Sequence, residues 1–102
     1  MIGKILDTVK SLELEGSTQI IYTSDHGDNI GERDLWGKSN FYEESVGVPL
    51  IMAGPEIPIG KVCQTPVSLI DIYPTILDTA NLSADSHKPG SCLLYTSPSP
   101  RD

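Results

Sequence analysis

Hydrophobic residues recur at the three- and four-residue spacing of an α-helix in two stretches of the chain. The first predicts a helix near the start, with Gly16 as its stop and an apolar face formed by Ile2, Ile5, Leu6, Val9 and Leu12. The second predicts a helix with Asp71 as N-cap and Pro74 tolerated in its first turn. The buried face predicted for this second helix consists of Ile72, Tyr73, Ile76, Leu77 and Ala80.

Two short apolar runs predict β-strands. They cover residues 19–24 (QIIYTS) and 48–53 (VPLIMA), and each has the length and composition of a buried strand. The element order then becomes helix, strand, long loop, strand, loop, helix, which predicts an α/β sandwich with a largely parallel sheet. Ligands collect at the carboxyl ends of strands in such sheets. We therefore expect the loop of residues 25–47, which is too long to be a plain connection, to be functional.

Length and charge limit the possible classes of protein. A chain of 102 residues is long enough for one small domain, and no apolar run approaches the roughly 18 residues of a membrane span. The formal net charge is −7, and the seven Lys and Arg residues form no basic cluster. Such a chain repels phosphate backbones, so we expect no nucleic-acid partner. The first residues also lack the pattern of a secretory signal.

The last eleven residues, CLLYTSPSPRD at 92–102, differ in character from the rest. They are small, polar and Pro-rich without periodicity, and back-translation resembles the adaptor of transposase-based sequencing libraries. We expect a disordered, translated adaptor scar here, with a genuine disordered tail as the alternative, and residues 1–91 as the biological sequence. Cys63 and Cys92 have no metal-site spacing, and no bridge between them is predicted.

Asp25 and His26 follow the first predicted strand directly. An acid beside an imidazole supplies one oxygen and one nitrogen ligand for a metal ion, although two ligands alone do not hold one. A strand-end Asp that caps a turn beside a surface histidine is the alternative. An EF-hand calcium loop is excluded because Gly27 and Ile30 break its alternation of acidic or amide residues.

Two further motifs carry little weight. Gly37, Lys38 and Ser39 resemble the end of a phosphate-binding P-loop, but five residues rather than four separate Gly31 from Gly37. This spacing argues against nucleotide binding. The tripeptide at residues 81–83 is a glycosylation sequon, which is common by chance and decides nothing.

The stretch of residues 22–53, YTSDHGDNIGERDLWGKSNFYEESVGVPLIMA, resembles the sulfatase family of the alkaline phosphatase superfamily, in particular choline-sulfatase-like and arylsulfatase-like members. An apolar strand ending in Ser-Asp-His-Gly, then Gly-Glu-Arg, Trp-x-Lys, Tyr-Glu-Glu and a Val-Pro-Leu-Ile strand recur in order. The later stretch TPVSLIDIYPTILDTANL is also similar. The resemblance implies an alkaline-phosphatase-like α/β sandwich with a mostly parallel sheet. In it, residues 1–91 would be an internal fragment from the C-terminal part of the catalytic domain.

The resemblance also implies roles for three residues. Asp25 and His26 match the C-terminal pair of ligands to a divalent cation, usually calcium, although many relatives have Asn in place of His26. Lys38 matches the lysine that contacts the sulfate group. A metal ion and a lysine would together supply the positive charge that a sulfate ester needs at its oxygens.

The nucleophile of the family is missing from this chain. It is a formylglycine made from Cys or Ser in a Cys/Ser-x-Pro-x-Arg motif, and the residues after Cys63 do not fit that motif. Gly47 also replaces an arginine that is frequent before the second strand. We therefore expect the chain alone to be inactive and the intact parent to hydrolyse a small-molecule or carbohydrate sulfate ester. A phosphonate or phosphate ester hydrolase, or a noncatalytic truncated product, is the alternative.

Overall fold

The computed structural model describes residues 1–95. The chain divides into two compact units, and the boundary in the sequence lies between Gly54 and Pro55. Residues 96–102, the larger part of the predicted adaptor scar, lie outside the described residues. Each unit is described by itself. Over the part of the chain that the structure covers, no helix has both the length and the apolar character needed to cross a membrane.

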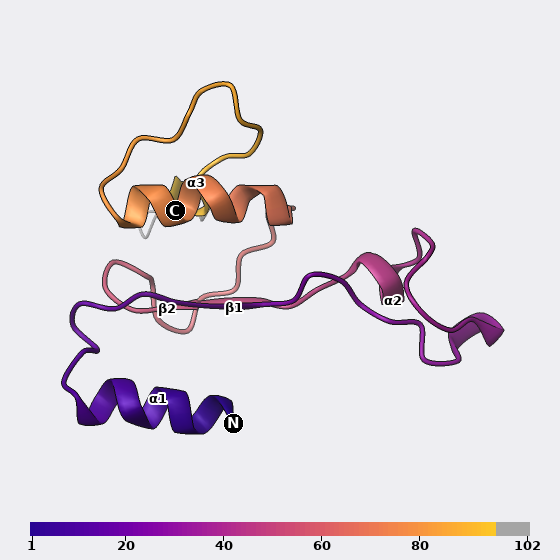
Figure 1. Cartoon of the computed structure of the whole chain (residues 1–102), viewed down its shortest axis with the longest axis horizontal. Helices are drawn as coiled ribbons and strands as arrows, with labels where there is room; N and C mark the ends of the chain where they lie inside the picture. Colours follow the sequence, from indigo (N-terminus) through magenta and orange to yellow (C-terminus); the bar gives the residue numbers. More distant parts are fainter. Residues whose placement is uncertain (96–102) are drawn as a thin grey trace. The chain divides into compact units, whose positions relative to one another are not determined.

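The first unit begins with the helix α1, Ile2–Ser11 (Figure 1). The predicted helix is confirmed, and it ends with Leu12 as its C-cap, before Gly16. Its apolar face forms as predicted but stays largely uncovered, because Val9 alone among the helix residues is shielded from solvent to an intermediate degree. This face therefore contributes little to the core of the unit.

The two predicted strands are β1, Ile20–Thr23, and β2, Leu50–Ala53. They pair antiparallel, with Ile20 opposite Ala53 and Thr23 opposite Leu50. Antiparallel pairing follows because the chain between them runs out and turns back without a crossover helix. This pair is the only sheet among the described residues, so the mostly parallel sheet of the larger fold stays a prediction.

The segment between the strands is not an open loop. It contains the 3-10 turn η1, Glu32–Asp34, and the short helix α2, Glu43–Val46. Figure 1 shows this segment leaving the strand ends and carrying α2 at a distance from them. The strand pairing places Thr23 opposite Leu50, so the two ends of the segment, Ser24 and Pro49, return to the same end of the strand pair.

The second unit is built on the helix α3, Ile72–Thr79, which continues the 3-10 turn η2, Leu69–Asp71. Asp71 occupies the predicted N-cap position but makes no side-chain cap bond to α3. Its carboxylate instead accepts hydrogen bonds from the backbone N–H of Ser68 and of Ser91, both at 2.8 Å. The carboxylate thus ties the start of α3 to a segment 20 residues later.

The buried face predicted for α3 is wrong. Tyr73 and Ile76 are 45% and 53% exposed, whereas Thr75 is fully buried. The reason is the turn η3, Leu93–Tyr95, which lies against the Thr75 side of the helix. Thr75 Oγ1 donates to the Asp71 carbonyl at 2.6 Å and accepts from the Leu93 N–H at 2.8 Å, and Leu93 is 5% exposed.

Candidate metal and sulfate site

Asp25 and His26 lie together immediately after β1. His26 Nδ1 is 2.6 Å from the carbonyl oxygen of Gly27, and His26 Nε2 is 3.4 Å from Asp25 Oδ2. A carbonyl only accepts hydrogen bonds, so Nδ1 carries the hydrogen, and in the neutral ring Nε2 keeps its lone pair. The imidazole is thus oriented with its unprotonated nitrogen toward the carboxylate, the arrangement that histidine ligands adopt when a carbonyl fixes their other nitrogen.

The Asp25 carboxylate is open to solvent, with 82% of its side chain exposed. Partial desolvation raises its pKa, but the electrostatic influence of His26, hydrogen bonds from the backbone and the charge of Lys38 together hold the pKa below its ordinary value. The backbone N–H of His26 donates to Asp25 Oδ1 at 3.0 Å. Asp25 is therefore an ionised, available oxygen ligand at neutral pH.

The pair fits part of a divalent metal site. Two ligands of one ion each lie about 2.0–2.6 Å from it, so 3.4 Å between Asp25 Oδ2 and His26 Nε2 suits neighbouring ligands. Within residues 1–95, however, no group of three or more His, Cys, Asp or Glu side chains is placed to hold an ion. The remaining ligands would have to come from elsewhere.

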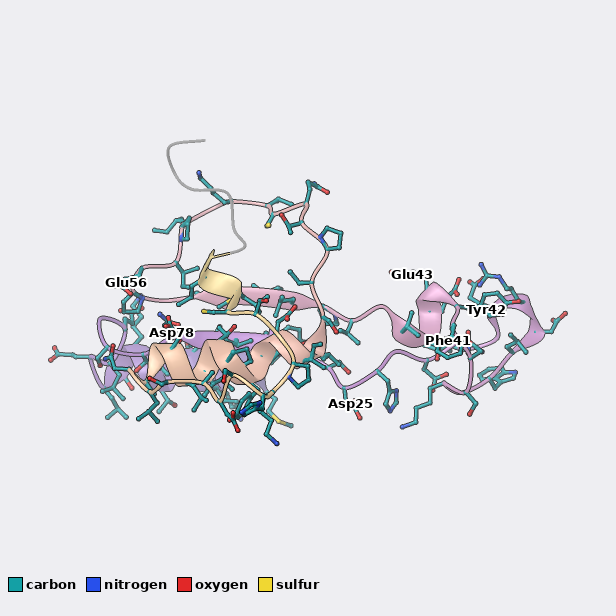
Figure 2. All side chains as sticks on the ribbon, turned by 90° about the horizontal axis from the view of Figure 1, so that it is seen from above. Asp25, Phe41, Tyr42, Glu43, Glu56 and Asp78 are labelled. Atoms are coloured by element: carbon teal, nitrogen blue, oxygen red, sulfur yellow. The ribbon has the colours of Figure 1, made fainter. Side chains whose placement is uncertain are left out.

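Lys38 lies on the same loop with an exposed side chain. Its charge contributes to the lowered pKa of Asp25, so the structure brings the ammonium within electrostatic range of the carboxylate. Figure 2 shows Asp25 near the strand end, while Phe41, Tyr42 and Glu43 lie farther out along the loop. Asp25 and His26 are thus in direct contact, and Lys38 acts on Asp25 through its charge.

The loop also contains a close backbone approach beside the candidate ligands. The Gly27 N–H donates to the Ser45 carbonyl at 2.8 Å, and a Cβ on Gly27 would lie 2.1 Å from the Glu44 carbonyl oxygen. Only glycine fits there without a backbone shift. The glycine is visible in the sequence, but its contact with Glu44 and Ser45 of α2 is visible only in the structure.

An ion pair fastens the outer part of the loop. Arg33 Nη1 is 2.6 Å from Glu44 Oε2, and the guanidinium lies over the Tyr42 ring, 4.5 Å from its centroid. Arg33 has a left-handed backbone (φ 54°), which side chains other than glycine adopt at a cost. The ion pair connects Arg33 to α2. Its partners are eleven residues apart, a separation at which the spacing of residues in the sequence gives no signal.

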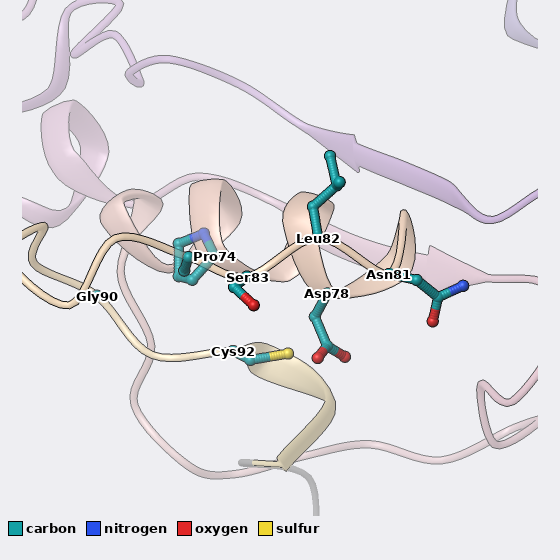
Figure 3. Close-up of a pocket in the computed structure, with 8 residues that line it drawn as sticks. Pro74, Asp78, Asn81, Leu82, Ser83, Gly90 and Cys92 are labelled. Carbon is teal, nitrogen blue, oxygen red and sulfur yellow. The ribbon is translucent and has the colours of Figure 1, made fainter.

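A separate hollow of about 500 Å³ lies in the second unit, between α3 and the chain that follows it (Figure 3). Asp78, Ser83 and Cys92 are among its lining residues. It contains none of the predicted site residues, which all belong to the first unit. We therefore assign it no part in the candidate site.

The three candidate residues lie on one loop after a strand, and α/β enzymes bind their ligands at strand ends. The model of the sulfatase family matches residues 1–82. The chain is 43% identical over 88 residues to a choline-sulfatase of Rhizobium meliloti (strain 1021) and 43% identical over 94 residues to arylsulfatase K of Mus musculus. The chain belongs to the sulfatase family, which confirms the resemblance seen in the sequence.

The matches cover 86% and 92% of this chain, but the chain spans only 17% of each of these relatives. Among solved structures, it is similar to a protein in complex with its substrate D-glucosamine-2-N,6-O-disulfate, with a TM-score of 0.87 and 33% identity over 92% of this chain and 19% of that chain. It is also similar to a phosphonate monoester hydrolase from Silicibacter pomeroyi, with a TM-score of 0.88 and 32% identity over 97% of this chain and 20% of that chain. These neighbours confirm the alkaline-phosphatase-like α/β class.

Proposed function

We propose that the intact protein containing these residues hydrolyses sulfuric esters, of a small molecule or a carbohydrate. The observation that supports this most directly is the match of residues 1–82 to the sulfatase family, since these residues include Asp25, His26 and Lys38. A further support is the similar protein solved with a disulfated glucosamine as its substrate. The activity belongs to the whole protein, because this chain carries no formylglycine motif.

Asp25 and His26 would hold a calcium ion, together with acids outside this chain. Calcium takes six to eight ligands, mostly oxygens, so the Asp25 carboxylate and one imidazole nitrogen would complete only a minor part of its shell. When bound, the ion would supply positive charge that polarises the sulfate oxygens. His26 would offer Nε2 to the ion, and this proposal is supported by the contact of Nδ1 with the Gly27 carbonyl, which leaves Nε2 on the side of Asp25.

Lys38 would contact the sulfate group. An ammonium at this place stabilises negative charge that grows on the transferring group and on the leaving oxygen. The side chain of Lys38 is exposed, which leaves its ammonium accessible to a ligand. The nucleophile, a formylglycine, would come from a segment outside this chain.

The test is an assay of the intact protein with a chromogenic aryl sulfate, with formylglycine verified by mass spectrometry. We expect turnover that is lost on chelation and restored by calcium. A formylglycine-bearing, calcium-loaded protein that turns over no sulfate ester would overturn the proposal.

The second candidate is hydrolysis of phosphonate or phosphate esters. The similarity to the phosphonate monoester hydrolase favours this function, because a protein with a similar structure in this region acts on a phosphonate ester. Parallel assays with a phenyl phosphonate monoester and an aryl sulfate separate the two functions. A kcat/KM higher for the phosphonate would select the second. If no intact parent exists, a noncatalytic truncated product would show neither activity.

A further inference from the structure

Three consecutive peptide groups around Lys38 are held by side chains from other parts of the loop. The N–H of Gly37 donates to Asp28 Oδ1 at 3.1 Å. The carbonyl of Gly37 accepts from both the backbone N–H of Asn29, at 3.0 Å, and Asn29 Nδ2, at 2.5 Å. The carbonyl of Lys38 accepts from Ser45 Oγ at 2.5 Å. The backbone at Lys38 is thus fixed on both sides of its Cα.

Two members of this clamp, Asn29 and Ser45, are buried. Asn29 is 1% exposed and Ser45 is 2% exposed. Among the described residues, Asn29 Oδ1 has no hydrogen-bond partner, so the burial of this amide is costly. The nitrogen of this amide, Nδ2, donates to the carbonyl of Gly37, directly before Lys38.

The clamp starts three residues after Asp25. Asp28 and Asn29 lie on the same outgoing arm of the loop as the candidate metal ligands, whereas Gly37 and Lys38 lie on its return. Bonds between the two arms therefore set the distance from the metal ligands to the lysine. A lysine side chain is flexible, so the position of its backbone decides where its ammonium can reach.

We propose that Asp28 is a positioning residue for Lys38, acting through the Gly37 N–H, with Asn29 and Ser45 completing the same clamp. This inference rests on the proposed contact between Lys38 and the sulfate group. Asp28 itself touches neither substrate nor ion in this account. Its Oδ1 accepts hydrogen bonds from the Gly37 N–H and from the Ile30 N–H, both at 3.1 Å, and an amide oxygen can accept in its place.

The experiment compares variants of the intact enzyme. Displacement of a reacting group by about 1 Å costs up to about a hundredfold in rate, so we expect Asp28→Ala to lower kcat by roughly tenfold to a hundredfold. Asp28→Asn keeps an acceptor for the Gly37 N–H and should stay within about threefold of the wild type. Glu32→Ala removes another exposed carboxylate of the loop as the control and should leave kcat within about twofold. Excess calcium should rescue none of the loss.

The decisive measurement is the double variant Asp28→Ala with Lys38→Ala. If Asp28 acts through Lys38, the second change should alter kcat by less than about twofold once Lys38 is absent. If Asp28 had a purely structural role, the factors by which the two single changes lower kcat would multiply in the double variant. Equal damage from Asp28→Asn and Asp28→Ala, or multiplied losses in the double variant, would overturn the inference.

The failure of this inference is distinguishable from the failure of the proposed function. If Lys38→Ala alone left kcat unchanged, the proposed role of Lys38 would fall, and the inference with it. If Lys38→Ala were slow but Asp28→Ala were not, only the inference would fall. Should Asp28→Ala fail to fold, Ser45→Ala removes a single hydroxyl of the clamp, and the same double-variant comparison with Lys38→Ala decides the question.

Discussion

The imidazole of His26 is held with Nε2 3.4 Å from Asp25 Oδ2, while its Nδ1 is anchored to the carbonyl of the next residue, Gly27. Asp25 and His26 would supply two neighbouring metal ligands, which do not make a complete metal site. This incompleteness explains why the isolated chain and an intact parent should behave differently toward calcium.

The isolated chain should hydrolyse neither sulfate nor phosphate esters and should bind calcium weakly. It offers Asp25 and His26 but no third nearby ligand among the described residues, and its sequence has no formylglycine motif. Calorimetric titration of the purified chain is the measurement. Micromolar affinity would contradict the incomplete-site account, and turnover of a chromogenic sulfate ester would contradict the expected inactivity.

Gly27→Ala should disturb the intact protein near the candidate ligands. The new Cβ would meet the Glu44 carbonyl oxygen at 2.1 Å, so the backbone beside His26 must shift. We expect a loss of about 1–3 kcal/mol in the free energy of unfolding, together with lower turnover. Gly3→Ala is the control, since its Cβ meets nothing within 4 Å and it lies in α1. Equal melting temperatures for Gly27→Ala and Gly3→Ala would contradict the close packing at Gly27.

Glu44 should make the intact protein more sensitive to acid. A hydrogen bond from its own backbone N–H and then the Arg33 guanidinium lower its pKa below the ordinary value of 4.5. A lowered pKa in the folded state means that this contribution to stability is present above about pH 4.5 and is lost as the pH falls through the folded-state value. Glu44→Gln should therefore lower the melting temperature at pH 7, and the difference from the wild type should shrink as the pH falls below 4.5.

The matched control for that prediction is Glu43→Gln, which removes the neighbouring carboxylate and keeps the pair of Arg33 with Glu44. Its melting temperature should follow the wild type more closely at pH 7. A Glu44→Gln deficit that grew on acidification would show that the carboxylate destabilises the fold instead.

Local features of the chain could be predicted from the sequence. The helices α1 and α3, both strands and the placement of Asp25 and His26 at a strand end follow from short-range spacing, which does not depend on distant partners. The antiparallel pairing of β1 with β2 and the burial of Thr75 in place of Tyr73 and Ile76 could not be predicted. These features arise from contacts with chain segments that lie far away in sequence, where periodicity carries no information.

The site divides in the same way. Lys38 was found through the resemblance to sulfatases, but the residues that hold its backbone were not, because Asp28, Asn29 and Ser45 have no common spacing. The Arg33 ion pair was missed for the same reason. Chemistry-bearing side chains are visible in a sequence, whereas their supports appear only when the two arms of the loop are brought together.

Asp25→Asn should weaken calcium binding by the intact enzyme. An amide is a poorer ligand than a carboxylate for a hard cation, so turnover at low calcium should fall. Excess calcium should restore part of the lost rate, because mass action compensates for lower affinity. A calcium titration of turnover measures this directly. A loss that no calcium concentration changes would contradict the ligand role of Asp25.

The most direct test of the central claim is the calcium titration of turnover for Lys38→Ala beside Asp25→Asn in the intact enzyme. A lost charge donor at the transition state costs about a hundredfold to a thousandfold, so Lys38→Ala should fall by that factor at every calcium concentration. Protein stability should hardly change, since the Lys38 side chain is exposed. Calcium should restore part of the turnover rate of Asp25→Asn and none of that of Lys38→Ala. A rate for Lys38→Ala within about threefold of the wild type, or equal rescue of both variants, would contradict the claim.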